Sequence, residues 1–218
     1  MKRRTLDILF SAGGVLLSGL LLVLGMVMTS NANFAKNYVK TQLAQQQIAF
    51  KTAATLTDEE KQSACLNKYA GLPLTTGKQA ECYANDFIGL HVKSVAGGLT
   101  YATLGTAQSA LNAQIATVKA ANPNDPTLAD LQAKSTAMTG QRDTLFKGET
   151  LRGLLLTSYG FSVFGVKGGQ VASVAYIVAI LLFLLSIAGF VHALRTPKEK
   201  LFAAPGTTPT PDDKQLVS

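Results

Sequence analysis

Two uninterrupted apolar segments constrain this chain more than any other feature of its sequence. The first runs from Ile8 to Met28 and the second from Val171 to Val191, and each has 21 residues without a charged side chain. At about 1.5 Å of rise per residue, a helix of this length covers the roughly 30 Å hydrocarbon core of a bilayer. Because a backbone in lipid must satisfy its own hydrogen bonds, we predict two transmembrane helices.

The composition agrees with a membrane protein and excludes a nucleic-acid binder. Hydrophobic residues make up 47% of the 218 residues and charged residues only 15%. The net charge is +7, but the basic residues are scattered and the chain has no Trp, so the basic patch of a nucleic-acid-binding surface is missing. Neither span contains an Asp, Glu, Lys or Arg, which argues against a proton relay or an ion pathway.

The charges that flank the spans predict their orientation. Three basic residues precede the first span and three follow the second, whereas the facing ends carry fewer; the residues are Lys2, Arg3 and Arg4, then Arg195, Lys198 and Lys200, against Lys36, Lys40 and Lys167. By the positive-inside rule we expect both termini in the cytoplasm. The expected parts are therefore a cytoplasmic N-terminus (1–7), spans at 8–28 and 171–191, an extracytoplasmic domain (29–170) and a disordered cytoplasmic tail (192–218) in the plasma membrane.

A cleaved signal peptide is the alternative for the first span. Ser30, Asn31 and Ala32 offer small residues at a suitable cleavage position. The apolar stretch is longer than the usual signal-peptide core of 7 to 15 residues, and the helical pattern continues from Asn33, which favours an uncleaved anchor.

The segment between the spans is expected to be helical, which makes the fold all-α with an extracytoplasmic helical hairpin or bundle. We predict that the first span continues as a helix to about Phe50. The sequence 57–60 forms a capping box before a short helix that carries Cys65, and 76–79 forms a second one. Beyond it a period of 3.5 residues predicts one long helix with a packing seam, weakened at Gly97 and Gly98. The positions are Tyr83, Phe87, Leu90, Ser94, Gly97, Tyr101, Leu104, Gln108, Leu111, Ile115 and Val118.

A turn at 122–125 is expected to make the next helix an antiparallel neighbour of the long one. Asp125 would be its N-cap and Pro126 its first residue. Leu128, Leu131, Met138 and Leu145 point to the same seam, and we expect this helix to end at Gly148 and a further break at 167–169.

Two sets of residues are candidate contacts with a partner. Gly14 and Ser18 place small side chains on the first span, as close packing of membrane helices requires. The segment 149–166 is nearly all apolar and contributes Leu154, Leu155, Phe161 and Phe164. Its residues either contact the membrane surface or another protein, or close the base of the domain's own core.

Cys65 and Cys82 are the only cysteines, and both lie in the segment that we expect outside the cell. A structural disulfide is the natural interpretation in an oxidising compartment, and closing this loop would contribute about 3 kcal/mol. A redox or metal pair is the rival, but the chain has no C-x-x-C motif and no His cluster. His91 and His192 lack ligands at metal spacing, so we expect no cofactor and no metal.

The residues give no sign of an enzyme. We find no nucleophile and base pair, phosphate loop or ligand set, and the cytoplasmic parts are too short to transmit a signal. We therefore expect a non-catalytic accessory subunit that binds other integral membrane subunits. The alternatives are an extracytoplasmic ligand-binding sensor or transport accessory protein, and a cell-envelope scaffold that uses the 13 basic against 9 acidic residues at 29–170.

The layout also resembles a known family. MKRR before the first span, an external helical segment with Cys65 and Cys82, and RTPKEK after the second span are similar to the prokaryotic respiratory supercomplex association factors of actinobacteria. The resemblance covers the whole chain in outline. It implies a subunit beside the cytochrome bcc and aa3 oxidase assembly that itself binds neither haem nor copper, and it transfers no site residues.

Overall fold

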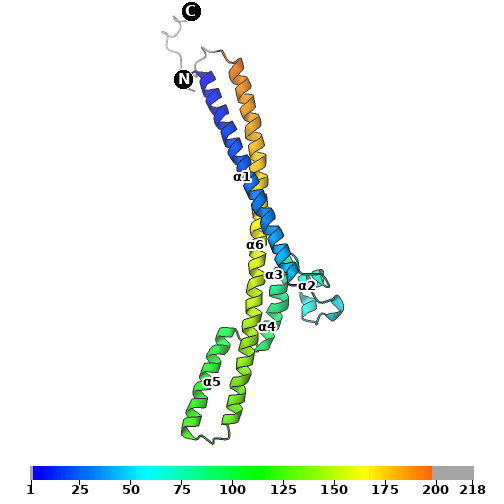
Figure 1. Cartoon of the computed structure of the whole chain (residues 1–218), viewed down its shortest axis with the longest axis vertical. Coiled ribbons are helices and arrows are strands. Elements are labelled where there is room, and N and C mark those ends of the chain that lie inside the picture. Colours follow the sequence, from blue (N-terminus) through cyan, green and yellow to red (C-terminus); the bar gives the residue numbers. More distant parts are fainter. Residues whose placement is uncertain (1, 198–218) are drawn as a thin grey trace, which may run out of the picture. The chain divides into compact units, whose positions relative to one another are not determined.

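The computed structural model describes residues 2–197, and the regular elements in this range are all helical (Figure 1). Two long helices, α1 (Arg3–Gln45) and α6 (Leu128–Arg195), contain windows apolar enough to cross a membrane, and only 17% of each window is buried. The chain divides into two compact units. Unit 1 comprises residues 1–31 and 168–218, and unit 2 comprises residues 32–167. The expected tail beyond Pro197 lies outside the described residues.

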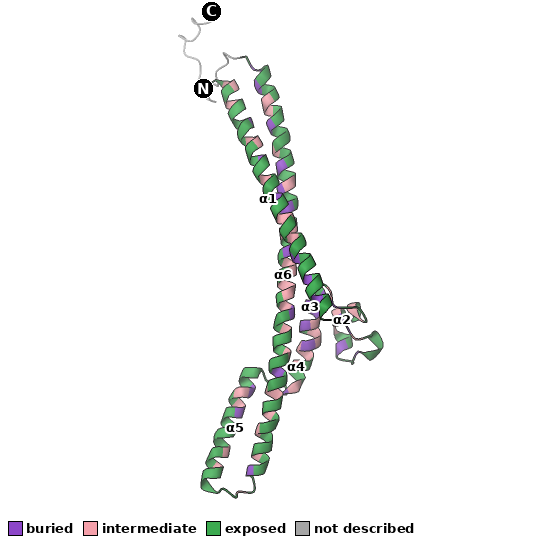
Figure 2. Cartoon of the chain, viewed as in Figure 1, coloured by how far each residue is buried: buried purple, intermediate pink, exposed green. Residues whose placement is uncertain are grey.

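In unit 1 the first part of α1 packs on the last part of α6 through small residues. The Ser18 hydroxyl donates a hydrogen bond of 2.9 Å to the carbonyl oxygen of Ala179, and Ser18 is 2% exposed. Further along, the side chain of Tyr176 covers Gly25, where an added Cβ would lie 2.6 Å from the ring. Bulky side chains cover the outward faces of both helices, which Figure 2 shows as mostly exposed.

Unit 2 has its own hydrophobic core, built by short helices on the sides of α1 and α6. These are α2 (Ala64–Tyr69), α3 (Gly77–Cys82), the π-helix η3 (Tyr83–Ile88) and α4 (Gly89–Val95), with the 3₁₀ turns η1 (Ala53–Thr55) and η2 (Glu60–Gln62). Around the ring of Phe50, the core buries apolar residues of α1, α2, α3, η3, α6 and the loops that connect them. That ring meets Tyr69 at 5.5 Å and Tyr83 at 5.3 Å between centroids.

The prediction that the first helix reaches Phe50 is wrong, because α1 ends at Gln45. Gln47 has a φ of 52°, which turns the chain out of the helix. The residues that follow are extended and pair with the segment at 71–74, where the Leu74 N–H donates to the Ile48 carbonyl at 2.8 Å. The turn allows Phe50 to enter the core, where it is 5% exposed.

The two predicted capping boxes have different outcomes. The Glu60 N–H donates to Thr57 Oγ1 and the Thr57 N–H to Glu60 Oε2, but this box begins only the 3₁₀ turn η2. Cys65 belongs to the separate helix α2, whose N-cap is Ser63. The prediction that the box at 57–60 begins the helix of Cys65 is therefore wrong. The box of Thr76 and Gln79 begins α3, as predicted.

The single long helix predicted after the second box is broken. A π-helical turn follows α3, and α4 ends before Gly97 and Gly98, whose φ angles are 61° and 89°. These left-handed conformations are open to Gly without the steric cost that a Cβ would add, so the two glycines end one helix instead of bending it. A new capping box at Thr100 then begins α5 (Tyr101–Ala121).

The α5 helix lies antiparallel to the first part of α6, and the two are joined by a short turn (Figure 1). The predicted seam positions Leu104, Gln108 and Leu145 are all buried here. The amide of Gln108 bridges the pair, donating to Thr139 Oγ1 at 2.7 Å and accepting from Arg142 Nη1 at 3.0 Å. A buried polar side chain is therefore satisfied across the seam.

The predicted breaks at Gly148 and at 167–169 do not occur, since α6 is continuous from Leu128 to Arg195. The helix begins at Leu128, two residues later than predicted, and Asp125 Oδ1 accepts the Thr127 N–H at 2.8 Å in the turn before it. Gly148 has a packing role: an added Cβ would collide with the side chain of Val92 on α4. Glycine costs a helix only about 1 kcal/mol, so tight packing and neighbouring helix formers override it.

Candidate functional site

An apolar groove in unit 2 is the first candidate for a binding surface. It has a volume of about 390 Å³ and lies between residues 38–48, at the end of α1, and residues 151–161 of α6. Its lining residues are Tyr38, Val39, Gln42, Leu43, Gln46, Ile48, Leu151, Leu154, Leu155, Thr157, Ser158 and Phe161. None of these twelve side chains carries a formal charge at neutral pH.

The groove is more apolar than its composition suggests. The Thr157 hydroxyl donates to the Gly153 carbonyl at 2.9 Å, and the Ser158 hydroxyl donates to the Leu154 carbonyl at 3.1 Å. Both hydroxyl protons are thus used within α6, so these two side chains offer the groove no hydrogen-bond donor. The remaining polar groups of the lining belong to Tyr38, Gln42 and Gln46.

Exposed aromatic side chains surround this groove or continue along its helices. Phe34 and Tyr38 stack with ring centroids 5.7 Å apart, and they are 64% and 49% exposed. On α6, Phe161 is 50% exposed and Phe164 is 78% exposed. Exposed apolar surfaces of this kind are typical of sites that contact another protein, a ligand or a membrane.

The four residues predicted from the segment 149–166 divide into two groups. Leu154, Phe161 and Phe164 have large exposed fractions, so they are accessible for a contact. Leu155 is only 3% exposed and belongs to the core of unit 2. Burial of Leu155 agrees with the core interpretation, whereas contact of the other three residues with a partner stays a prediction.

Gly14 and Ser18, the other two candidate contacts, face α6 within unit 1. A Cβ on Gly14 would collide with Ser186, and the Ser18 hydroxyl binds the Ala179 carbonyl. The small side chains thus serve packing within the chain.

A matching pattern of small residues on α6 was not predicted from the sequence. Five small residues recur at intervals of seven: Gly165, Ala172, Ala179, Ser186 and Ala193. All five are buried, and on α1 buried small residues recur at the same interval at Ser11, Ser18 and Gly25. A strict seven-residue repeat is the signal of helices packed along one seam. The pattern was hidden because bulky residues dominate the composition of the second span.

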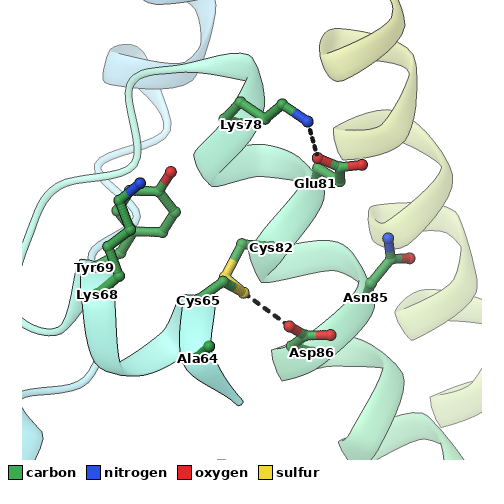
Figure 3. Close-up of a pocket in the computed structure, with 9 residues that line it drawn as sticks. All are labelled: Ala64, Cys65, Lys68, Tyr69, Lys78, Glu81, Cys82, Asn85 and Asp86. Carbon is green, nitrogen blue, oxygen red and sulfur yellow. Dashed lines mark hydrogen bonds and ion pairs between the residues drawn. A yellow bond between two sulfur atoms is a disulfide. The ribbon is translucent and has the colours of Figure 1, made fainter.

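A second, polar pocket of about 440 Å³ holds the disulfide between Cys65 and Cys82 (Figure 3). The bond joins α2 to α3 across a Cα–Cα distance of 6.0 Å. Asp86 lies beside it, with Oδ2 at 2.8 Å from Cys65 Sγ. A bonded sulfur has no proton to donate, so this is a contact between the carboxylate and the disulfide. Because the two sulfurs bind each other, the three residues do not fit a metal site in this state.

Glu60 connects the loop after α1 to α4. It is 2% exposed, and its carboxylate accepts hydrogen bonds from the Lys51 ammonium at 2.8 and 3.1 Å. Nε2 of His91 lies 3.8 Å away. Burial raises the pKa of Glu60, but the hydrogen bonds from Lys51 and Thr57 and the charges of Lys51 and His91 outweigh it, so the net pKa is below the ordinary value.

The same carboxylate affects the neighbouring ring of Tyr83. Burial raises the pKa of the Tyr83 hydroxyl, and the Glu60 charge raises it further. The hydroxyl therefore stays neutral at physiological pH, and this cluster supports the fold of unit 2 without offering a chemical group of unusual reactivity.

Comparison with known protein families, characterised proteins and solved structures finds no significant match to this chain.

Proposed function

We propose that this protein is a membrane-anchored, non-catalytic accessory subunit that binds other integral membrane subunits. The observation that carries the proposal is the uncharged groove of unit 2 with its exposed aromatic side chains. Leaving this surface in water costs about 25 cal/mol for each Å² of apolar area, and a partner that covers it recovers that free energy. Exposed aromatic residues are also the side chains that dominate the energy of protein interfaces.

The proposed topology places α1 and α6 across the plasma membrane with both termini in the cytoplasm and the residues of unit 2 outside. The length and hydropathy of the two helices support the membrane placement. The disulfide supports an oxidising compartment for unit 2, since such bonds persist mainly outside the cytosol. The excess of basic residues at the outer ends of the spans supports the orientation.

The proposed partner complex is the respiratory assembly of cytochrome bcc and aa3 oxidase. The support is the resemblance in layout to the supercomplex association factors. Beside such an assembly, the bulky outward faces of the spans would contact lipid or neighbouring subunits, and the groove would take an apolar segment of a partner. The protein would contribute contacts and leave electron transfer to the other subunits.

Affinity purification of the full chain in a mild detergent tests this proposal. We expect the tagged protein to recover integral membrane subunits, with the absorbance bands of haem in the eluate. The double variant F161S/F164S should recover them at least tenfold less well, because two exposed aromatic contacts are lost.

F146S is the matched control, because Phe146 is an exposed aromatic residue of the same helix outside the groove, at 57% exposure. Phe164, by contrast, lies about one turn after the lining residue Phe161. F146S should leave recovery unchanged. Recovery of this chain alone would refute the accessory role, and recovery of transporter subunits instead would assign the groove to another complex.

Two other functions would be favoured by other results of binding experiments. A groove of about 390 Å³ has the size of a small-molecule site, which supports a ligand-binding sensor or transport accessory protein. Native mass spectrometry that finds a small apolar molecule bound to the wild type, and absent from F161S/F164S, would favour this function. Binding to isolated cell-wall polymer would instead favour a cell-envelope scaffold.

A further inference from the structure

We propose that Asp86 protects the Cys65–Cys82 disulfide by repelling the thiolates that would cleave it. The bond lines an open, polar pocket, so small reductants from solution can reach it. Cys82 is buried at 5% exposure whereas Cys65 is half-buried, so Cys65 is the more accessible residue of the pair. Asp86 is the residue whose carboxylate contacts the Cys65 sulfur, at 2.8 Å.

The position of Asp86 is fixed by its neighbours. Its Oδ2 accepts a hydrogen bond of 2.8 Å from the Ser63 hydroxyl, and Ser63 in turn is the N-cap of the helix that carries Cys65. The Asp86 carboxylate on η3 is thus tied to the start of α2, next to the sulfur of Cys65 (Figure 3).

The other charged groups of the pocket do not neutralise Asp86. Lys78 pairs with Glu81 at 2.9 Å, and it also lies over the ring of Tyr159. Lys68 lies over the ring of Tyr69, with its nitrogen 5.2 Å from the ring centroid. Neither lysine makes an ion pair with Asp86, so the nearest full charge to the Cys65 sulfur is negative.

The chemistry of reduction makes this charge effective at both steps. The thiolate of one reductant molecule bonds to Cys65 Sγ while the bond to Cys82 Sγ breaks, and Cys82 leaves with the electron pair as a thiolate. The thiolate of a second reductant molecule then bonds to the sulfur of the first, which releases Cys65 as a thiolate beside Asp86. The two reductant molecules are together oxidised by two electrons to their disulfide. An anion approaches the carboxylate in the first step and an anion forms beside it in the second, and both are unfavourable.

Reduction rates with thiols of different charge test the proposal on the full-length oxidised protein in detergent. The reductants are the anionic 2-mercaptoethanesulfonate, the neutral 2-mercaptoethanol and the cationic cysteamine, and alkylation followed by mass spectrometry counts the free thiols. We expect Asp86→Asn to accelerate reduction on the order of tenfold with the anionic thiol, less with the neutral one and least with the cationic one. Added salt should shrink the difference.

Three further variants make the result decisive. Asp86→Glu keeps the charge and should keep the protection, whereas Asp58→Asn removes an exposed carboxylate outside the pocket and should change no rate. If Asp86→Asn does not fold, Ser63→Ala takes its place. This variant removes the hydrogen bond that holds the Asp86 carboxylate. Reduction should again accelerate most with the anionic thiol and least with the cationic one. Equal acceleration by all three thiols would mean that Asp86 only supports the local fold, and that result, or unchanged rates, would overturn the proposal.

Discussion

Glu60 shows how a single residue links distant parts of unit 2. Its carboxylate accepts hydrogen bonds from the Lys51 ammonium, in the loop after α1, and from the backbone N–H of Thr57. It also lies beside His91 of α4. A buried charge is tolerated only when its partners replace the lost water. The exposed Asp58 nearby offers a comparison, because its side chain is fully exposed.

We expect Glu60→Gln to lower the free energy of unfolding by about 1–3 kcal/mol at pH 7, because it leaves Lys51 without its partner. Asp58→Asn should change it by no more than about 0.5 kcal/mol. Urea unfolding of the full chain in detergent, followed by tyrosine fluorescence, measures both. An equal effect of the two substitutions would contradict the importance of the buried ion pair.

The pH dependence of stability follows from the lowered pKa of Glu60. A carboxyl group whose pKa is lower in the folded state stabilises the protein above its ordinary value of 4.5, and this contribution is lost as the pH falls through the folded pKa. The wild type should therefore lose more stability than Glu60→Gln when the pH falls below 4.5. The difference between their unfolding midpoints at pH 7 and at pH 3.5 measures it.

At the level of the helices, local signals were readable from the sequence and long-range ones were not. The capping box at Thr76 and the seam positions Leu104 and Gln108 are local patterns, and the structure contains them. The end of α1 depends on burial of Phe50 among rings from other helices, which no short window of sequence records. Likewise, Gly97 ends a helix whereas Gly148 lies inside one, and only the surrounding packing separates the two cases.

One wall of the candidate groove was predictable from a local sequence pattern, and the other wall was not. The apolar run that contains Leu154 and Phe161 stands out in the sequence. That Tyr38 and Gln42 form the opposite wall follows from the packing of α1 on α6 in unit 2. The small-residue repeat of α6 is itself a sequence pattern, but the abundance of leucine around it concealed its period.

The packing of the two spans gives a prediction at the same level. Ala179 is fully buried against α1, whereas Ala188 of the same helix is exposed. Ala179→Leu should destabilise unit 1 by about 1–3 kcal/mol through overpacking, and Ala188→Leu should have little effect. Melting temperatures of the full chain in detergent measure the difference. If both leucine variants melt alike, the small-residue seam does not hold the spans together.

At the scale of the whole molecule, the proposed topology can be tested by introducing one additional cysteine at a time. The native cysteines are joined to each other, so they do not react with thiol reagents. Asn124→Cys places a thiol in the exposed turn before α6, and Lys2→Cys places one next to the N-terminus. In intact cells a membrane-impermeant maleimide should label the first variant and spare the second. Labelling of Lys2→Cys alone would reverse the orientation.

The interval of seven between the small residues of α6 makes the second span sensitive to its length. One residue inserted after Ala179 would rotate Ser186 and Ala193 by about 100° and turn leucines toward α1. Seven inserted residues would restore the phase. Such a helix can exchange one bulky exposed side chain for another with little penalty, but it cannot gain or lose a single position without losing this packing.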